Sequence, residues 1–244
     1  MKDTAPALDA LDLDRHAFFF DFDGTLADFT DDPADVGLDA RLGADLSRLY
    51  QRTGGAVAIL TGRHRAEILA HVDAAIPVAG LHGTEFPGDE VTHDPTLAQQ
   101  VAPLLPALSD LVARFPGTLL ERKDHGFALH WRQAPHYEQA MIAAAEQAQA
   151  DLGPAWVIQH GKFVAELRQA GGDKGTALRR FMTAPPFAGR LPVAFGDDLN
   201  DMPMLAAARE LGGLAVCMGE RDLPADHRLS GPAALATWLE RRLA

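Results

Sequence analysis

Residues 18–26, FFFDFDGTL, constrain the fold most, because an apolar run ends abruptly in two carboxylates. Three consecutive phenylalanines predict a strand buried on both faces, since a strand with one exposed face alternates apolar and polar residues. Asp21 and Asp23 at the end of such a strand need a partner such as a cation, because an unpaired buried carboxylate is costly. The segment alone also allows an ordinary strand followed by an Asp-Gly turn.

Composition narrows the range of partners. The 244 residues carry 22 Lys and Arg against 34 Asp and Glu, a net charge of −12, which argues against a nucleic-acid or anionic membrane surface. Cys217 is the single cysteine, so neither an internal disulfide nor a cysteine-rich zinc site can form. The first residues lack the apolar core of a signal peptide, and no run reaches the length of a membrane span. We therefore expect a cytoplasmic protein without a membrane partner.

Strand-like runs alternate with helical patterns in both outer parts of the chain, which predicts an α/β fold with a mainly parallel sheet. The predicted strands are residues 17–21, 56–61, 78–81, 191–195 and 214–216. The predicted helices are residues 39–51, 63–71, 174–183 and 201–208.

The middle of the chain follows a different pattern. Residues 95–114 and 135–152 predict two amphipathic helices, each followed by a pair of strands, at 118–122 and 126–131 and then at 155–159 and 163–167. A repeated helix–strand–strand order predicts an α+β layer with an antiparallel sheet. Pro87-Gly88 and Gly171-Gly172 mark its edges. We therefore predict a discontinuous core, residues 1–86 and 171–244, that carries an inserted lid, residues 87–170.

Two further segments, one at the end of a core strand and one at the start of a helix, could meet the first. Thr61-Gly62-Arg63 provides a hydroxyl, a helix N-terminus and a guanidinium, a combination that suits a phosphate group. Taken without the other motifs, this segment is better explained as an N-cap threonine with a turn glycine. Lys174 lies among glycines just before a helix, where it could balance the charge of a phosphate and an aspartate.

The fourth segment, residues 194–201 with the sequence AFGDDLND, again ends an apolar strand in acidic residues. Three aspartates in five residues repel one another unless a divalent cation and a lysine compensate them, although a solvent-exposed loop could also carry them. Oxygen ligands without a thiolate or histidine cluster favour Mg²⁺ over Zn²⁺. A nucleophilic carboxylate, a second acid and a metal at one place are typical of phosphoryl transfer.

The order Asp-x-Asp-Gly-Thr, Thr-Gly-Arg, Lys and Gly-Asp-Asp-x-x-Asp resembles the haloacid dehalogenase-like phosphohydrolase superfamily. The resemblance implies a Rossmann-like core with an inserted cap of the C2 type. It further implies that Asp21 is the nucleophile and that Asp23 protonates the leaving oxygen and then activates water. Thr61 would bind the phosphoryl group, and Lys174 would neutralise it beside the nucleophile.

The same resemblance implies a metal site. Mg²⁺ would be held by Asp21, by the backbone carbonyl of Asp23 and by Asp197. Asp198 and Asp201 would support the metal site and the lysine.

A narrower resemblance, to trehalose-6-phosphate phosphatases, extends from about residue 16 to 240. It is carried by residues 80–85 (GLHGTE), 121–123 (ERK), 128–135 (ALHWRQAP), 161–166 (GKFVAE) and 185–190 (PPFAGR). The implied reaction is the hydrolysis of trehalose 6-phosphate, a small sugar phosphate, through an aspartyl-phosphate, as the last step of trehalose biosynthesis. Functional pairing with a trehalose-6-phosphate synthase follows from that role.

Sugar recognition requires hydrogen bonds to vicinal hydroxyls, which charged and planar polar groups on a closing lid can provide. The substrate-binding candidates are Gly62, Arg63, His82, Glu121, Lys123, Arg132, Lys162 and Glu166. His130 lies between Leu129 and Trp131, so we interpret it as a buried structural histidine rather than a ligand.

One departure from the family pattern concerns the substrate. The family usually has Asp-Asp-x-Thr-Asp-Glu, whereas residues 197–202 read DDLNDM, as in the broader sugar-phosphatase branch. A phosphatase of another sugar or polyol phosphate therefore remains the alternative. A phosphomutase and a non-catalytic regulatory partner of a synthase are the other classes, although the second would be expected to lose the nucleophile, the acid or the lysine.

Overall fold

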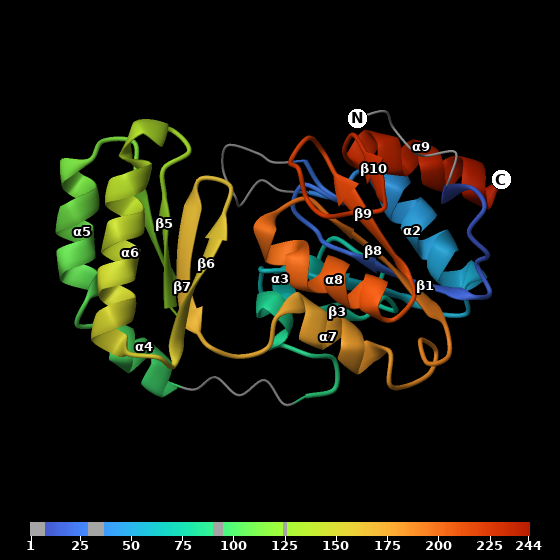
Figure 1. Ribbon diagram of the computed structural model, residues 1–244, viewed down its shortest axis with the longest axis horizontal. Helices are drawn as coiled ribbons and strands as arrows, with labels where there is room; N and C mark the ends of the chain where they lie inside the picture. The colour runs from blue at the N-terminus through green and yellow to red at the C-terminus, as the bar shows by residue number, and fades with distance from the viewer. Residues whose placement is uncertain (1–7, 29–36, 90–94, 124–125) are drawn as a thin grey trace. The chain divides into compact units, whose positions relative to one another are not determined.

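The computed structural model describes residues 8–28, 37–89, 95–123 and 126–244 (Figure 1). The chain divides into two compact units. Met1–Asp89 and Gly172–Ala244 form the first, here called the core unit, and Glu90–Gly171 form the second, the inserted unit. The function of the inserted unit as a lid stays a prediction.

The core unit contains a six-stranded sheet in the order β10-β9-β8-β1-β2-β3. All of its pairings are parallel, which confirms the predicted parallel sheet. Its strands are β1 (His16–Phe20), β2 (Val57–Leu60), β3 (Val78–Ala79), β8 (Leu191–Gly196), β9 (Leu214–Met218) and β10 (His227–Leu229). The edge strand β10 was not predicted, because three residues that include His227 and Arg228 form no recognisable apolar run.

Helices cover both faces of this sheet, which explains the unbroken phenylalanine run of β1. Phe18 and Phe20 pack in one apolar cluster with α2 (Ala40–Arg52) and α9 (Pro232–Leu243). Phe19 points the other way, into a second cluster with α7 (Lys174–Phe181) and α8 (Met202–Glu210). Every second residue of a strand faces the same side, so both faces must be apolar when both are covered. Figure 1 shows α2 beside α9 and α7 beside α8.

The inserted unit contains a four-stranded antiparallel sheet in the order β4-β5-β7-β6. Its strands are β4 (Leu119–Lys123), β5 (Gly126–His130), β6 (Trp156–Gly161) and β7 (Val164–Gln169). Helices α4 (Pro95–Val101), α5 (Leu105–Arg114) and α6 (Glu138–Leu152) lie against this sheet (Figure 1). One sheet face and these helices bury an apolar cluster, which agrees with the α+β layer expected from the sequence.

One predicted helix is wrong. Residues 95–114 form two helices, α4 and α5, rather than one. Pro103 lies between them, and proline lacks the N–H that a helix interior requires and disfavours helical geometry in the residue before it. Among the residues that the structure describes, no helix has the length and apolar character of a membrane-spanning segment.

Candidate active site

Adjacent strand ends bring three of the sequence motifs together. Asp21 directly follows β1, Asp197 follows β8 and Thr61 follows β2, and β1 lies between β8 and β2 in the sheet. The N–H of Asp21 donates to the carbonyl of Phe195 at 2.9 Å, so the backbone hydrogen bonding between β1 and β8 continues as far as Asp21. Parallel strands place their carboxyl ends at one edge of a sheet, which is where open α/β sheets bind ligands.

Lys174 joins two of the buried carboxylates. Its Nζ lies 2.5 Å from Oδ1 of Asp21 and 2.6 Å from Oδ1 of Asp201. Lys174 is 1% exposed and Asp201 is 0% exposed, so this ion pair is shielded from water. The ammonium of Lys174 therefore supplies part of the positive charge that the acidic motifs require.

Two glycines make this close approach possible. A Cβ on Gly196 would lie 2.5 Å from Cβ of Asp201, so only glycine lets that side chain fold back against the end of β8. A Cβ on Gly175 would lie 2.3 Å from the carbonyl oxygen of Pro203, so glycine also allows α7 to pack tightly on α8. Gly175, directly after Lys174, and Gly196, directly before Asp197, are thus required by packing.

Asp201 braces the loop that carries Asp197. Its Oδ2 accepts the backbone N–H groups of Asp197 at 2.9 Å and Asp198 at 3.1 Å, while Oδ1 accepts from Lys174. Asp198 caps the short helix η4 (Leu199–Asp201) through the N–H of Leu199 and forms an ion pair with Arg221 at 2.9 Å. Arg221 was not predicted from the sequence, because it lies in no recognisable motif.

The three carboxylates repel one another in a buried site. Burial, followed by the charge of Asp201, raises the pKa of Asp21 well above its usual value, against the opposing effect of Lys174. Burial and the charges of Asp201 and Asp198 raise the pKa of Asp197 to about 8. Burial alone would lower the pKa of Lys174, but the charges of Asp201 and Asp21 outweigh it and raise that pKa.

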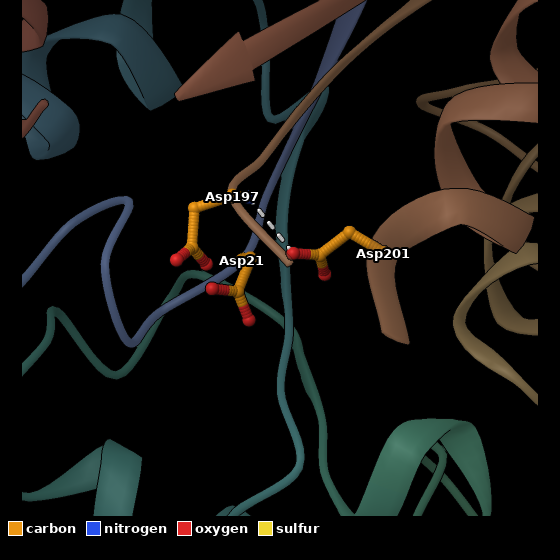
Figure 2. Close-up of side chains that lie close together, drawn as sticks. All are labelled: Asp21, Asp197 and Asp201. Atoms are coloured by element: carbon orange, nitrogen blue, oxygen red, sulfur yellow. Dashed lines mark hydrogen bonds between the residues drawn. The ribbon is translucent and has the colours of Figure 1, made fainter. Parts of the chain in front are cut away.

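This donor set fits a hard divalent cation. One carboxylate oxygen from each of Asp21, Asp197 and Asp201 lies within 4.8 Å of the others. Figure 2 shows these three side chains close together. Both oxygens of Asp201 already accept hydrogen bonds, so Asp21 and Asp197 are the better ligands. A cation beside them would relieve the repulsion that raises both pKa values.

A second loop supports the Thr61-Gly62-Arg63 turn. The N–H of His82 donates to the carbonyl of Thr61 at 2.8 Å, and Oγ1 of Thr61 accepts the N–H of Arg63 at 3.0 Å. A Cβ on Gly62 would lie 2.7 Å from Cε1 of His82, so the imidazole packs directly against the glycine. His82 is 3% exposed and has a φ of 55°, a left-handed conformation that is unusual for a residue with a side chain.

The carboxylate of Glu85 also belongs to this support, because it accepts the N–H of Arg65 at 2.6 Å at the start of α3 (Arg65–Leu69). Through these contacts, the loop of residues 80–85 supports the Thr61-Gly62-Arg63 turn and the start of α3. The guanidinium of Arg63 donates hydrogen bonds to both carboxylate oxygens of Asp23. The structure therefore brings Asp23 to the same strand-end region as the other motifs.

Three of the substrate-binding candidates, Glu121, Lys123 and Glu166, share one face of the inserted sheet. Glu121 and Glu166 both pair with Ala128, from opposite sides, and Gln159 pairs with Glu166, so the four residues form one row. Direct cross-strand partners lie on the same face of an antiparallel sheet. We call this face, opposite the helices, the polar face, and it carries Glu121, Lys123, Ala128, His130, Gln159, Glu166 and Arg168.

The electrostatics of the polar face favour an ionised Glu121. Burial raises the pKa of this carboxyl, but a hydrogen bond from His130 and the charge of Lys123 outweigh it, so the pKa is lowered. The interpretation of His130 as a core residue is wrong, because its side chain is 26% exposed and bonds to Glu121. Arg168 and Gln159 were missed, although the two-residue period from Glu166 indicated Arg168.

The other two substrate-binding candidates of the inserted unit, Arg132 and Lys162, lie at one end of the same sheet. Arg132 follows β5 and is exposed, and Lys162 is exposed in the turn between β6 and β7. The N–H of Trp131 donates to the carbonyl of Phe163 at 3.0 Å, which joins the two segments. Both residues lie just beyond the strand ends, whereas Glu121 and Glu166 lie within their strands.

Comparisons with known proteins show the family of the chain. Residues 19–224 match the family described as trehalose-phosphatase. The chain is 36% identical over 241 residues to the trehalose-6-phosphate phosphatase of Escherichia coli K12, with 97% of this chain and 90% of that protein covered. It is 38% identical over 232 residues to a probable trehalose-phosphate phosphatase of Sinorhizobium fredii, with 92% and 86% covered.

A solved structure supports the fold. The C-terminal domain of the trehalose-6-phosphate phosphatase of C. albicans superposes with a TM-score of 0.80, covering 94% of this chain and 93% of that one. Its sequence identity is 20%, so this likeness bears on the fold alone.

Proposed function

The chain belongs to the trehalose-phosphatase family, and from this premise we propose that it hydrolyses trehalose 6-phosphate to trehalose and inorganic phosphate. It is a phosphoric monoester hydrolase of the haloacid dehalogenase-like superfamily. The observation that carries the reaction type is the buried contact between Lys174 and Asp21 at the end of β1, beside Asp197. A carboxylate held by a lysine at a strand end can attack a phosphorus atom.

In the first step, a carboxylate oxygen of Asp21 attacks phosphorus and the bond from phosphorus to the sugar oxygen breaks. The departing sugar oxygen takes a proton from the carboxyl of Asp23. Lys174 and the Thr61 turn offset the negative charge of the phosphoryl group, since preorganised donors stabilise charge that develops in the transition state.

In the second step, the carboxylate of Asp23 removes a proton from water, and the water oxygen attacks the phosphorus of the aspartyl-phosphate. The bond from phosphorus to Asp21 breaks, which releases phosphate and regenerates the carboxylate. One residue thus acts first as an acid and then as a base.

We propose Mg²⁺ as the cation, held by Asp21, by the backbone carbonyl of Asp23 and by Asp197. When bound, it supplies positive charge that lets a phosphate dianion approach a carboxylate. Asp198 and Asp201 contribute by holding the loop and Lys174 in place.

The inserted unit is proposed to recognise the sugar. Glu121, Lys123 and Glu166 share the polar face and provide acceptors and a donor for hydroxyl groups. Arg132 and Lys162 are weaker candidates, because they lie at the end of the sheet. For His82, burial against Gly62 favours a supporting role over direct contact with the substrate.

Release of inorganic phosphate from trehalose 6-phosphate, with Mg²⁺ and with EDTA, tests the proposal directly. Asp21→Asn is expected to abolish release and to leave the fold intact, as circular dichroism would show. Full activity of this variant would refute the nucleophile assignment. The enzyme would consume the product of a trehalose-6-phosphate synthase, so the proposal includes a functional pairing with that class of enzyme.

Residues 197–202 motivate a substrate panel, because Asn200 and Met202 stand where the family usually has Thr and Glu. The ratio kcat/KM should be highest for trehalose 6-phosphate among several sugar and polyol phosphates, since this ratio measures discrimination in the transition state. An equal ratio for glucose 6-phosphate would favour the broader sugar-phosphatase function.

A further inference from the structure

His130 makes a side-chain contact on the polar face that backbone pairing does not impose. Its Nε2 lies 2.8 Å from Oε2 of Glu121, although the backbone partner of Glu121 is Ala128 and that of His130 is Leu119. An ionised carboxylate only accepts hydrogen bonds, so the imidazole is the donor. The contact therefore crosses the β4–β5 pair diagonally and selects one orientation of the Glu121 carboxylate.

Lys123 competes for the same carboxylate. Its Nζ lies 3.1 Å from Oε1 of Glu166 and 3.9 Å from Oε1 of Glu121, so only Glu166 is within hydrogen-bond distance. Without another donor, Glu121 would gain energy by turning toward this ammonium. The hydrogen bond from His130 to the opposite oxygen, Oε2, resists that rotation.

The separation of the two carboxylates is built into the sheet. Ala128 pairs with Glu121 on one side and with Glu166 on the other, so only a methyl group lies between them in the row. Carboxylates that stay apart across such a small residue can each accept a hydrogen bond from a polyhydroxyl ligand. If the Glu121 carboxylate turned toward Lys123, it would accept a hydrogen bond from that ammonium. It would then be less able to accept one from a ligand.

We propose that His130 is a positioning residue for carbohydrate recognition, holding Glu121 so that its carboxylate accepts from sugar hydroxyls instead of closing onto Lys123. The inference rests on the proposed function and extends it to a residue that contacts the ligand only through Glu121. A purely structural role, tying β4 to β5, would change stability without changing which substrate is preferred.

Kinetics with two substrates separate these roles. Trehalose 6-phosphate has a sugar to recognise, whereas p-nitrophenyl phosphate has none. His130→Leu should raise KM for trehalose 6-phosphate by about 10-fold, the effect of one hydrogen bond to a charged group, with a smaller change in kcat. The kcat/KM for p-nitrophenyl phosphate should stay within about twofold of the wild type, and His130→Gln, which keeps an N–H donor, should restore most of the lost affinity.

Two further variants make the assignment specific. In a Glu121→Gln background, His130→Leu should add less than about twofold, because residues that act through one contact are not additive. His160→Leu is the matched control, since His160 pairs with Ala165 and therefore lies on the opposite face of the same sheet. This control variant should leave KM and kcat unchanged for both substrates.

Three results would overturn the inference. These are an unchanged KM for trehalose 6-phosphate in His130→Leu, equal losses on both substrates, and full additivity with Glu121→Gln. Failure of the proposed function looks different, because the wild type would then show no preference for trehalose 6-phosphate, or Glu121→Gln alone would leave its KM unchanged.

Discussion

The guanidinium of Arg63 holds the side chain of Asp23 by both carboxylate oxygens. Nε lies 3.0 Å from Oδ1 and 2.8 Å from Oδ2, and Nη2 lies 2.8 Å from Oδ1. The two residues are 40 positions apart, in the turns after β1 and β2. A planar fork orients a carboxylate in a way that a single ammonium cannot, so this contact fixes the direction of the proposed acid–base residue.

Arg63→Lys should therefore impair proton transfer more than phosphoryl binding. We expect kcat/KM to fall by about 10-fold or more for trehalose 6-phosphate, within the range of general acid catalysis, and much less for p-nitrophenyl phosphate. The sugar oxygen needs a proton to depart, whereas p-nitrophenolate is a good leaving group without one. Steady-state kinetics with both substrates provide the measurement.

Asp23→Asn is the reference variant for that comparison and should show the same selectivity with a larger loss. An equal fall for both substrates in Arg63→Lys would contradict the expectation. It would mean that Arg63 acts on the phosphoryl group, which the two substrates share.

Lys174 should be as important for stability as for turnover. Lys174→Met leaves Asp21 and Asp201 buried without their cation, and removing one partner of a buried ion pair typically costs about 3–5 kcal/mol. Adding Asp21→Asn to this variant should recover part of the loss, because one of the two unpaired charges disappears. Urea unfolding in EDTA measures both effects, and a double variant no more stable than Lys174→Met would argue against this charge balance.

The metal-free protein should lose stability as the pH rises. The pKa of Asp197 is raised to about 8 on folding, so its contribution is most favourable below the unfolded value near 4 and is lost as the pH rises through about 8. The raised pKa of Asp21 acts in the same direction. In EDTA, Asp197→Asn should raise the unfolding temperature at pH 8 by about 2–4 °C for each kcal/mol gained, and by less at pH 5.

Thermal unfolding at both pH values, with EDTA and with Mg²⁺, checks this expectation. Mg²⁺ should stabilise the wild type more than Asp197→Asn, since the asparagine lacks the charged ligand. A wild-type protein whose stability in EDTA rises between pH 5 and pH 8 relative to Asp197→Asn would show that the carboxylates do not repel as described.

Gly62→Ala should disturb the turn that holds Thr61. The new methyl group would lie 2.7 Å from the buried ring of His82, and overpacking of this kind costs about 1–3 kcal/mol. We expect kcat/KM to fall for both substrates, because the turn serves the phosphoryl group common to them. His82→Ala in the same protein should recover part of the stability by making room, and no recovery would argue against direct packing of the ring on the glycine.

The chemistry-bearing residues could be found from the sequence because their signals are local. Asp21, Thr61 and Asp197 each end an apolar run, and the parallel fold then places such ends at one edge. The break at Pro103 was missed because the apolar pattern continues across it, although the helical backbone does not. His130 was assigned to the core because its strand is apolar, and only the side-chain arrangement on the folded sheet shows its hydrogen bond to Glu121.

By itself, the sequence determined the fold class, the order of the motifs and the identity of the acidic residues and the lysine, because strand burial and turn chemistry depend on neighbours along the chain. The tertiary structure alone decided which atoms meet. Lys174 reaches Asp21 across 153 positions, and Asp201 accepts two backbone N–H groups in addition to Lys174. Such pairings depend on side-chain packing at distances of 2.5 to 3.1 Å, which spacing along the sequence does not encode.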